Sequence, residues 1–188
     1  WGVNTDNELI KFQVNTSGFT LATSNEIGSD VLGRSSAACG IAGNHIYYIP
    51  YGDGAEGGGE GELDIRSVTK TGTGDGRKVN NFDMNGSSDD DLAFVRLGFD
   101  NNGVGWIVAK GSNNAFHVAK FMVDGSGGVS GNTNTNNATG PSRVGTFTIT
   151  NGSNLGSGDL AFDTNGSMYL LVNTNSGTNV SIYVISAA

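Results

Sequence analysis

The stretch GFDNNGVGWIV at residues 98–108 decides the fold, because two strand-like runs flank an Asn-Gly pair. A similar stretch, FDTNGSMYLLV, returns at residues 162–172. Asn-Gly favours the type I′ turn, whose two central residues both need positive φ and whose twist matches the strands that it joins. Each stretch therefore predicts a β-hairpin.

Internal repetition extends beyond these two hairpins. The tetrapeptide Asp-Leu-Ala-Phe at residues 91–94 recurs at 159–162, an offset of 159 − 91 = 68 residues. A more divergent third copy runs over residues 37–49, with a turn at Gly43-Asn44. Self-similarity of this kind indicates repeated supersecondary units.

Each hairpin is followed by further strand-like segments, and no window shows the apolar spacing of an amphipathic helix. Third strands are expected at residues 9–14, 63–68, 116–121 and 180–184, and fourth strands at 19–23, 79–84 and 144–149. Four antiparallel strands per unit form a β-propeller blade. We therefore predict an all-β single propeller fragment, 1–188, with approximate blades at 1–30 (partial), 37–85, 91–150 and 159–188 (partial).

The two partial blades leave this predicted ring of about three to four blades incomplete. The first lacks its inner strand and the last its outer strand. Because both already hold second and third strands, neither can complete the other, and the chain cannot close the ring by strand exchange. Exposed strand edges carry free N–H and C=O groups that recruit other strands. We therefore expect further polypeptide, from the same chain or from a partner subunit, to complete the open blades.

Composition excludes several classes of function. A formal charge of −8 and a pI near 4.5 argue against nucleic acid, which binds proteins through Lys and Arg. No apolar run approaches the roughly 20 residues that cross a bilayer, so no membrane insertion is expected. The single cysteine, Cys39, allows no internal disulfide and lies in an apolar run typical of a small buried residue.

The stretches at residues 91–107 and 158–170 resemble the blades of secreted β-propeller proteins of Bacteroidota, and the likeness extends loosely over residues 37–186. The resemblance implies export, often by type IX secretion, and an extracellular or cell-surface, adhesin-like role without assigned activity. Trp-Asp repeat endings and sialidase-type Asp boxes are both missing from the sequence. Enzymatic roles of those propeller classes therefore gain no support.

Two groups of residues are candidate binding sites. Trp106, Tyr169 and Tyr47 could stack on a sugar ring, although packing between blades uses the same residue types. The acidic run at residues 83–91 places oxygen side chains at alternate positions, which makes calcium a candidate cofactor, with these ligands: Asp83, Asn85, Ser87 and Asp89. Phe94 stands where a bidentate Glu belongs, so a solvated turn is the alternative.

No catalytic constellation emerges, so we predict a non-enzymatic extracellular binding or adhesion scaffold that contacts other polypeptide in a cell-surface assembly. One alternative is a glycan-binding, lectin-like propeller. A second alternative is a propeller hydrolase or lyase that uses Asp91 and Asp159 beside the inner strands, since acid–base catalysis needs carboxylates held close together. Their repetition equally indicates turn capping.

Overall fold

The computed structural model describes the backbone over residues 2–3, 8–15, 18–26, 36–50, 62–70, 77–83, 93–110, 115–130, 142–149, 158–174 and 179–185. The regular structure in these ranges is β-strand throughout, which confirms the all-β prediction. They contain no helix that is long and apolar enough to cross a membrane.

The strands form four antiparallel sheets, and in each sheet the spatial order follows the chain order. The sheets are β1 (Gly2–Val3), β2 (Glu8–Asn15) and β3 (Gly18–Glu26); β4 (Ser36–Ala42), β5 (His45–Pro50), β6 (Glu62–Thr69) and β7 (Arg77–Asp83); β8 (Ala93–Phe99), β9 (Val104–Lys110), β10 (Ala115–Met122) and β11 (Ser142–Thr148); and β12 (Gly158–Phe162), β13 (Met168–Thr174) and β14 (Asn179–Ile185).

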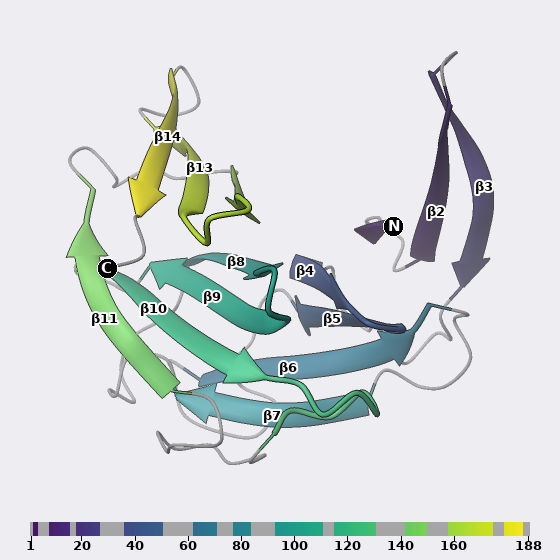
Figure 1. The fold of residues 1–188 in the computed structure, drawn as a ribbon, viewed down its shortest axis with the longest axis horizontal. Coiled ribbons are helices and arrows are strands. Elements are labelled where there is room, and N and C mark those ends of the chain that lie inside the picture. Colours follow the sequence, from purple (N-terminus) through teal and green to yellow (C-terminus); the bar gives the residue numbers. More distant parts are fainter. Residues whose placement is uncertain are drawn as a thin grey trace.

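The first strands of successive sheets lie side by side. Strand β8 contacts β4 on one side and β12 on the other, and β1 contacts β4 (Figure 1). The sheets therefore follow one another through their first strands. Their assembly as blades of an incomplete ring stays a prediction.

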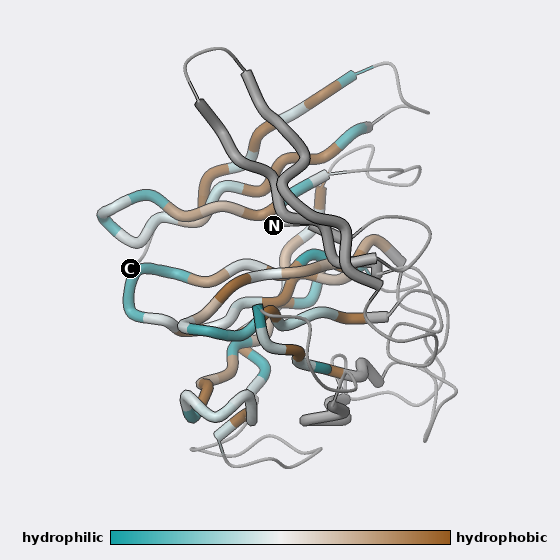
Figure 2. The backbone as a smooth tube through the Cα atoms, turned by 90° about the vertical axis from the view of Figure 1, so that its right-hand side faces the viewer, coloured by the Kyte–Doolittle hydropathy of each residue, from teal (hydrophilic) through white to brown (hydrophobic). Residues whose placement is uncertain are grey.

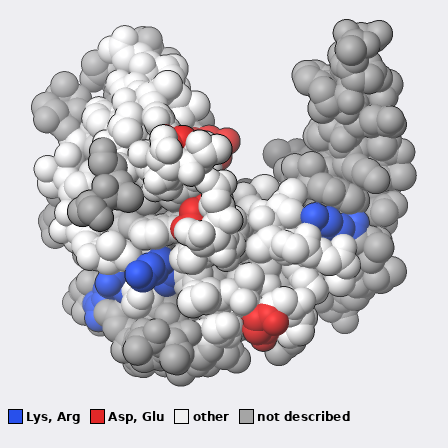
Figure 3. Space-filling model, viewed as in Figure 1, with Lys and Arg blue, Asp and Glu red and all other residues white. Residues whose placement is uncertain are grey.

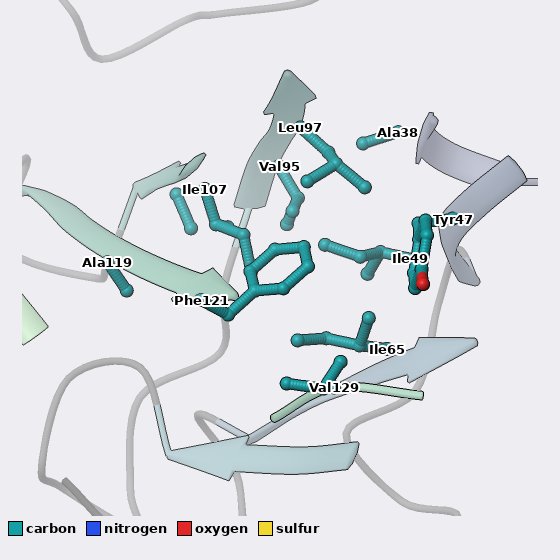
Figure 4. Packing of buried hydrophobic residues seen from close by; sticks show 11 residues of the cluster. Ala38, Tyr47, Ile49, Ile65, Val95, Leu97, Ile107, Ala119, Phe121 and Val129 are labelled. Carbon is teal, nitrogen blue, oxygen red and sulfur yellow. The ribbon is translucent and has the colours of Figure 1, made fainter. Parts of the chain in front are cut away.

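Two apolar clusters fill the spaces on either side of the sheet β8–β11. One joins it to β4–β7 through Tyr47, Ile49, Leu97 and Phe121, and Figure 4 shows the Phe121 side chain lying among Ile107, Val95 and Ile49. The other joins β8–β11 to β12–β14 and contains these residues: Phe94, Val108, Phe116, Val118, Ile149, Leu160, Met168, Leu170 and Val172. Because neighbouring residues of a strand face opposite sides, β8 contributes to both clusters.

Hydropathy follows the same arrangement. In Figure 2 the apolar residues concentrate within the strands, whereas hydrophilic residues occupy the hairpin turns at one end. Cys39, expected to be buried, is exposed. It alternates with Ala38, which faces the sheet β8–β11, and so its side chain lies on the opposite side of β4.

The hairpins form where predicted, but their turns are not of type I′. Gly103 and Gly166 have φ values of 76° and 84°, while Asn102 and Asn165 are not among the described residues with positive φ. Each turn also closes with a backbone hydrogen bond from the glycine N–H to an aspartate carbonyl three residues earlier, Asp100 or Asp163. This is a longer loop that places only glycine in the left-handed region.

The strand pairing also gives the hairpins a repeat offset that differs from the 68 residues between the two Asp-Leu-Ala-Phe copies. Gly98 pairs with Trp106 just as Ala161 pairs with Tyr169, so the two hairpins correspond at an offset of 161 − 98 = 63. Phe94 stands near the start of β8, whereas Phe162 ends β12. The two Asp-Leu-Ala-Phe copies therefore occupy different structural positions.

Candidate functional site

The hairpin turns use aspartate side chains to bind the backbone. Oδ1 of Asp100 accepts hydrogen bonds from the N–H groups of Asn102 and Val104, at 2.8 and 3.0 Å. Oδ1 of Asp163 accepts from Asn165 and Ser167 in the same way, at 2.8 and 2.9 Å. These carboxylates are thus occupied with shaping the turns.

A third aspartate, Asp124, repeats this pattern in a turn after β10. Its Oδ1 accepts from the N–H groups of Ser126 and Gly128, at 2.8 and 3.0 Å. The turn is held against the preceding sheet, because the Tyr47 hydroxyl donates to the Gly128 carbonyl over 3.3 Å. Asp124 therefore also has a structural role.

The predicted aromatic residues occupy one repeated position, and their surroundings are structural. Tyr47 is fully buried, with its ring centroid 5.4 Å from that of Phe99. Trp106 is half-buried; its ring lies 6.1 Å from Phe162. Tyr169 is half-buried, and its hydroxyl donates to Oδ2 of Asp163 over 3.2 Å. Because the Tyr47 ring is fully buried, it has no exposed face on which a sugar could stack.

The predicted calcium ligands fall mostly outside the described residues. Asn85, Ser87 and Asp89 lie outside them, and of Asp83 only the backbone is described, at the end of β7. Among the described residues, no group of three or more His, Cys, Asp or Glu could hold a metal ion.

The structure brings together a different set of polar residues on the first strands β8 and β12. Arg96 lies half-buried on β8, where its Nε donates to the Gly158 carbonyl of β12 over 2.7 Å. Its guanidinium also lies 4.3 Å from the centroid of the Phe94 ring, a cation–π distance. The side chain is thus fixed between two sheets.

A strained residue supports this arginine. Phe94 has a φ of 51°, which is unusual for a bulky side chain, and the register of β8 shifts between Ala93 and Arg96. The bulge directs the Phe94 ring edge-on toward Phe116, at a centroid distance of 5.9 Å. Strained backbone of this kind persists where the surrounding packing holds it and is frequent at functional sites.

Asp159 follows Gly158 on β12 and is exposed. Its Oδ1 accepts a hydrogen bond from the Leu160 N–H over 2.8 Å. Burial lowers the pKa of the Arg96 guanidinium, and the negative charge of Asp159 acts in the opposite direction. We call Phe94, Arg96 and Asp159 the inner-strand cluster.

Sequence reasoning singled out Asp159 but missed Arg96. The available signal was a cation in the middle of the strand-like run at residues 93–99, where apolar residues are expected. Asp91, the other predicted carboxylate, lies outside the described residues. Figure 3 shows that charged side chains are sparse among the described residues of the face in view, and they form no large patch of either sign there.

Comparison with known proteins bears on the fold alone. No protein-family model and no curated protein matches the chain. An exo-β-1,3-galactanase from Phanerochaete chrysosporium, solved with β-1,3-galactotriose, aligns with a TM-score of 0.53 at 12% identity, over 95% of this chain and 39% of that chain. An exo-β-1,3-galactanase from Clostridium thermocellum aligns with a TM-score of 0.51 at 10% identity, over 79% of this chain and 33% of that chain.

The fold is β-propeller-like. The chain spans 39% and 33% of the lengths of these two structures. The predicted adhesion scaffold and its glycan-binding and hydrolase alternatives stay predictions. The predicted export, cell-surface location and likeness to Bacteroidota proteins stay predictions.

Proposed function

We propose that this chain is a carbohydrate-recognising portion of a β-propeller protein, with its sheets as blades of an incomplete ring and its binding site at the inner-strand cluster. The observation that carries the proposal is an arginine fixed on β8 together with an exposed aspartate on the neighbouring first strand β12. The β-propeller-like fold, found also in two galactanases, supports a glycan as the ligand class.

The chemistry of the two side chains suits sugar hydroxyls. Arg96 offers planar N–H donors already held in one orientation by Gly158 and Phe94, so little side-chain entropy remains to be lost on binding. Asp159 is an acceptor, and charge-assisted hydrogen bonds are stronger than neutral ones. Sugar hydroxyls both donate and accept, so a hydroxyl-rich ligand can donate to Asp159 or accept from Arg96.

Binding is favoured over cleavage by the roles of the described aspartates. Asp100, Asp124 and Asp163 each accept two backbone hydrogen bonds within a turn. Hydrogen bonds from Ser167 lead those that lower the pKa of Asp163, so this group stays ionised and is a poor proton donor. Among the aspartates whose side chains the structure describes, those other than Asp159 are therefore engaged in turns.

The test is calorimetric titration of the chain with β-1,3-galactotriose, together with a glycan array. We expect binding by the unsubstituted chain and a loss of about tenfold or more in Arg96→Lys and Asp159→Asn, since each removes a charge-assisted contact. Arg143→Lys, on the exposed outer strand β11, is the matched control and should bind normally.

Two results would contradict this proposal. If no glycan on the array binds, or if binding survives both cluster substitutions, the site is elsewhere or the ligand is not a carbohydrate. Release of reducing sugar from β-1,3-galactan, lost in Asp159→Asn, would instead establish the hydrolase alternative.

A further inference from the structure

The contacts between successive sheets repeat in detail. Phe99, at the end of β8, packs against Gly40 of β4, where a Cβ would lie 2.8 Å from the phenylalanine Cδ2. Phe162, at the end of β12, packs against Gly98 of β8, where a Cβ would lie 3.3 Å from its Cε2. The sheets β4–β7 and β8–β11 thus each receive the phenylalanine of the next sheet on a glycine of their first strand.

An aromatic residue of the second strand completes each contact. The Tyr47 ring meets Phe99 at 5.4 Å and the Trp106 ring meets Phe162 at 6.1 Å. In register, Gly40 pairs with Tyr47 and Gly98 with Trp106. A small residue opposite an aromatic residue therefore forms the seat for the incoming phenylalanine.

The corresponding position of the last sheet has no occupant among the described residues, and its small residue is alanine in place of glycine. Ala161 pairs with Tyr169, and Ala161 is exposed. Apolar residues continue this face across β13 and β14: Leu171 is 36% exposed, and its cross-strand partner Ile182 is 64% exposed. Val180 and Val184 are exposed as well.

The corresponding face of the preceding sheet shows what normally covers such residues. Val108 pairs with Val118 there, as Leu171 pairs with Ile182, yet these valines are 0% and 8% exposed because β12–β14 packs on them. Contiguous exposed apolar residues on a sheet mark an interaction surface. The face of β12–β14 thus continues an interface already formed twice within the chain. Asp159 lies at the edge of this face, opposite Leu171, and corresponds to Arg96 of β8, which stays only half-buried although β12–β14 packs on its sheet.

We propose that this face docks a further antiparallel sheet of the same repeat, supplied by polypeptide outside residues 1–188, whose phenylalanine seats on Ala161 and Tyr169. A second copy of this chain is unsuited as the donor. Its first-strand phenylalanines before Asp-x-Asn-Gly turns, Phe99 and Phe162, are already seated within their own chain.

The experiment extends the full chain by a copy of residues 123–188, which supplies a fourth strand beside β14 and a following sheet. The probe is that appended sheet, and the readout is hydrogen exchange in β13 and β14 of the original chain. Seating of the appended Phe162 should slow exchange about tenfold or more, because local opening then breaks an added interface. Phe162→Ala in the appended copy alone should abolish much of this protection.

A second readout separates docking from a failure of the appended copy to fold. Ile182→Thr with Val184→Thr should leave the thermal midpoint of the 188-residue chain nearly unchanged, since both side chains are exposed. The same pair should lower the midpoint of the extended chain. Unchanged exchange in β13 and β14 together with no such lowering would overturn the proposal, as would a dimer of the 188-residue chain that these threonines dissociate.

Discussion

The indole Nε1 of Trp106 donates a hydrogen bond to Oδ2 of Asp100 over 3.0 Å, six residues earlier in the chain. The other oxygen of the same carboxylate accepts the two backbone bonds of the turn. Tyr169 and Asp163 repeat this arrangement at the same spacing. One aspartate thus shapes a turn and also orients an aromatic ring that packs toward the next sheet.

Replacing Asp100 should destabilise the chain in two separable steps. In Asp100→Asn the amide oxygen can still accept the two backbone bonds of the turn, but an NH2 group replaces the oxygen that accepts from the Trp106 N–H. Asp100→Ala removes all three bonds. We expect losses of about 1 kcal/mol and about 2–3 kcal/mol in the free energy of unfolding. Urea denaturation measures both.

The control for Asp100 is Thr164→Ala, because Thr164 is exposed in the equivalent turn and should change stability by less than about 0.5 kcal/mol. In the Asp100→Asn background, Trp106→Phe should cost less than in the natural chain. Additive losses in this double-mutant cycle would show that the hydrogen bond contributes nothing.

Asp163 should make stability depend on pH in the acid range. Backbone bonds, led by that of Ser167, hold its pKa below the ordinary value of 3.8. The folded chain therefore binds this proton less readily than the unfolded chain, so the stabilisation is present above about pH 4 and is lost as pH falls through the folded pKa. The free energy of unfolding, measured between pH 2 and 6, should depend less on pH in Asp163→Asn than in the natural chain. An unchanged pH dependence would contradict the assignment.

The strands and turns could be predicted from the sequence because local residue patterns specify them. The alternation in residues 116–121 and 180–184 and the Asn-Gly pairs each specify a strand or turn without reference to distant residues. Both segments form strands and both Asn-Gly pairs lie in turns in the structure. Local pattern was sufficient wherever one face of a strand is buried and the other is not.

The site and the repeat register were harder to predict because they depend on contacts between sheets. Asp-Leu-Ala-Phe looked like a repeat, but the bulge at Phe94 shifts β8 relative to that motif. Arg96 gained its position from Gly158, 62 residues away, which no local pattern reveals. Tyr47 and Trp106 share a position but differ in burial, since the turn at Asp124 covers only Tyr47.

Gly105 should tolerate no side chain. A Cβ there would lie 2.3 Å from Cζ of Phe121, a ring fixed by Tyr47 and Phe99 in the buried cluster. We expect Gly105→Ala to cost about 2–3 kcal/mol through overpacking. Gly145→Ala, in strand β11 with open space around its Cβ, is the matched control and should be neutral or slightly stabilising.

A smaller side chain at position 121 should rescue the Gly105→Ala variant. Phe121→Leu in the Gly105→Ala background should recover part of the lost stability, although the same substitution destabilises the natural chain. Chemical denaturation of the natural chain, the two single variants and the double variant gives the coupling energy. If the two losses simply add, the clash between this pair is not the cause.

Two adjacent tyrosines should make the fold sensitive to alkali. Burial, and after it the negative charge of Asp124, raises the pKa of Tyr47 to about 12. Burial raises the pKa of Tyr48 to about 12 as well, although Arg66 acts in the opposite direction. The unfolded chain releases these protons near pH 10, the ordinary value, while the folded chain retains them. Their contribution to stability is therefore complete below about pH 10 and declines between pH 10 and 12.

Thermal unfolding at pH 7–12 measures this decline. Tyr47→Phe removes one ionisable group, so its thermal midpoint should fall less steeply above pH 10 than that of the natural chain. The same substitution should lower the midpoint at pH 7, because the hydroxyl no longer donates to the Gly128 carbonyl. Tyr48→Phe should reduce the alkaline slope by a similar share, and the double variant further. Equal alkaline slopes in all four chains would mean that both hydroxyls reach solvent in the folded protein, and the buried position of the β5 strand in the core would have to be revised.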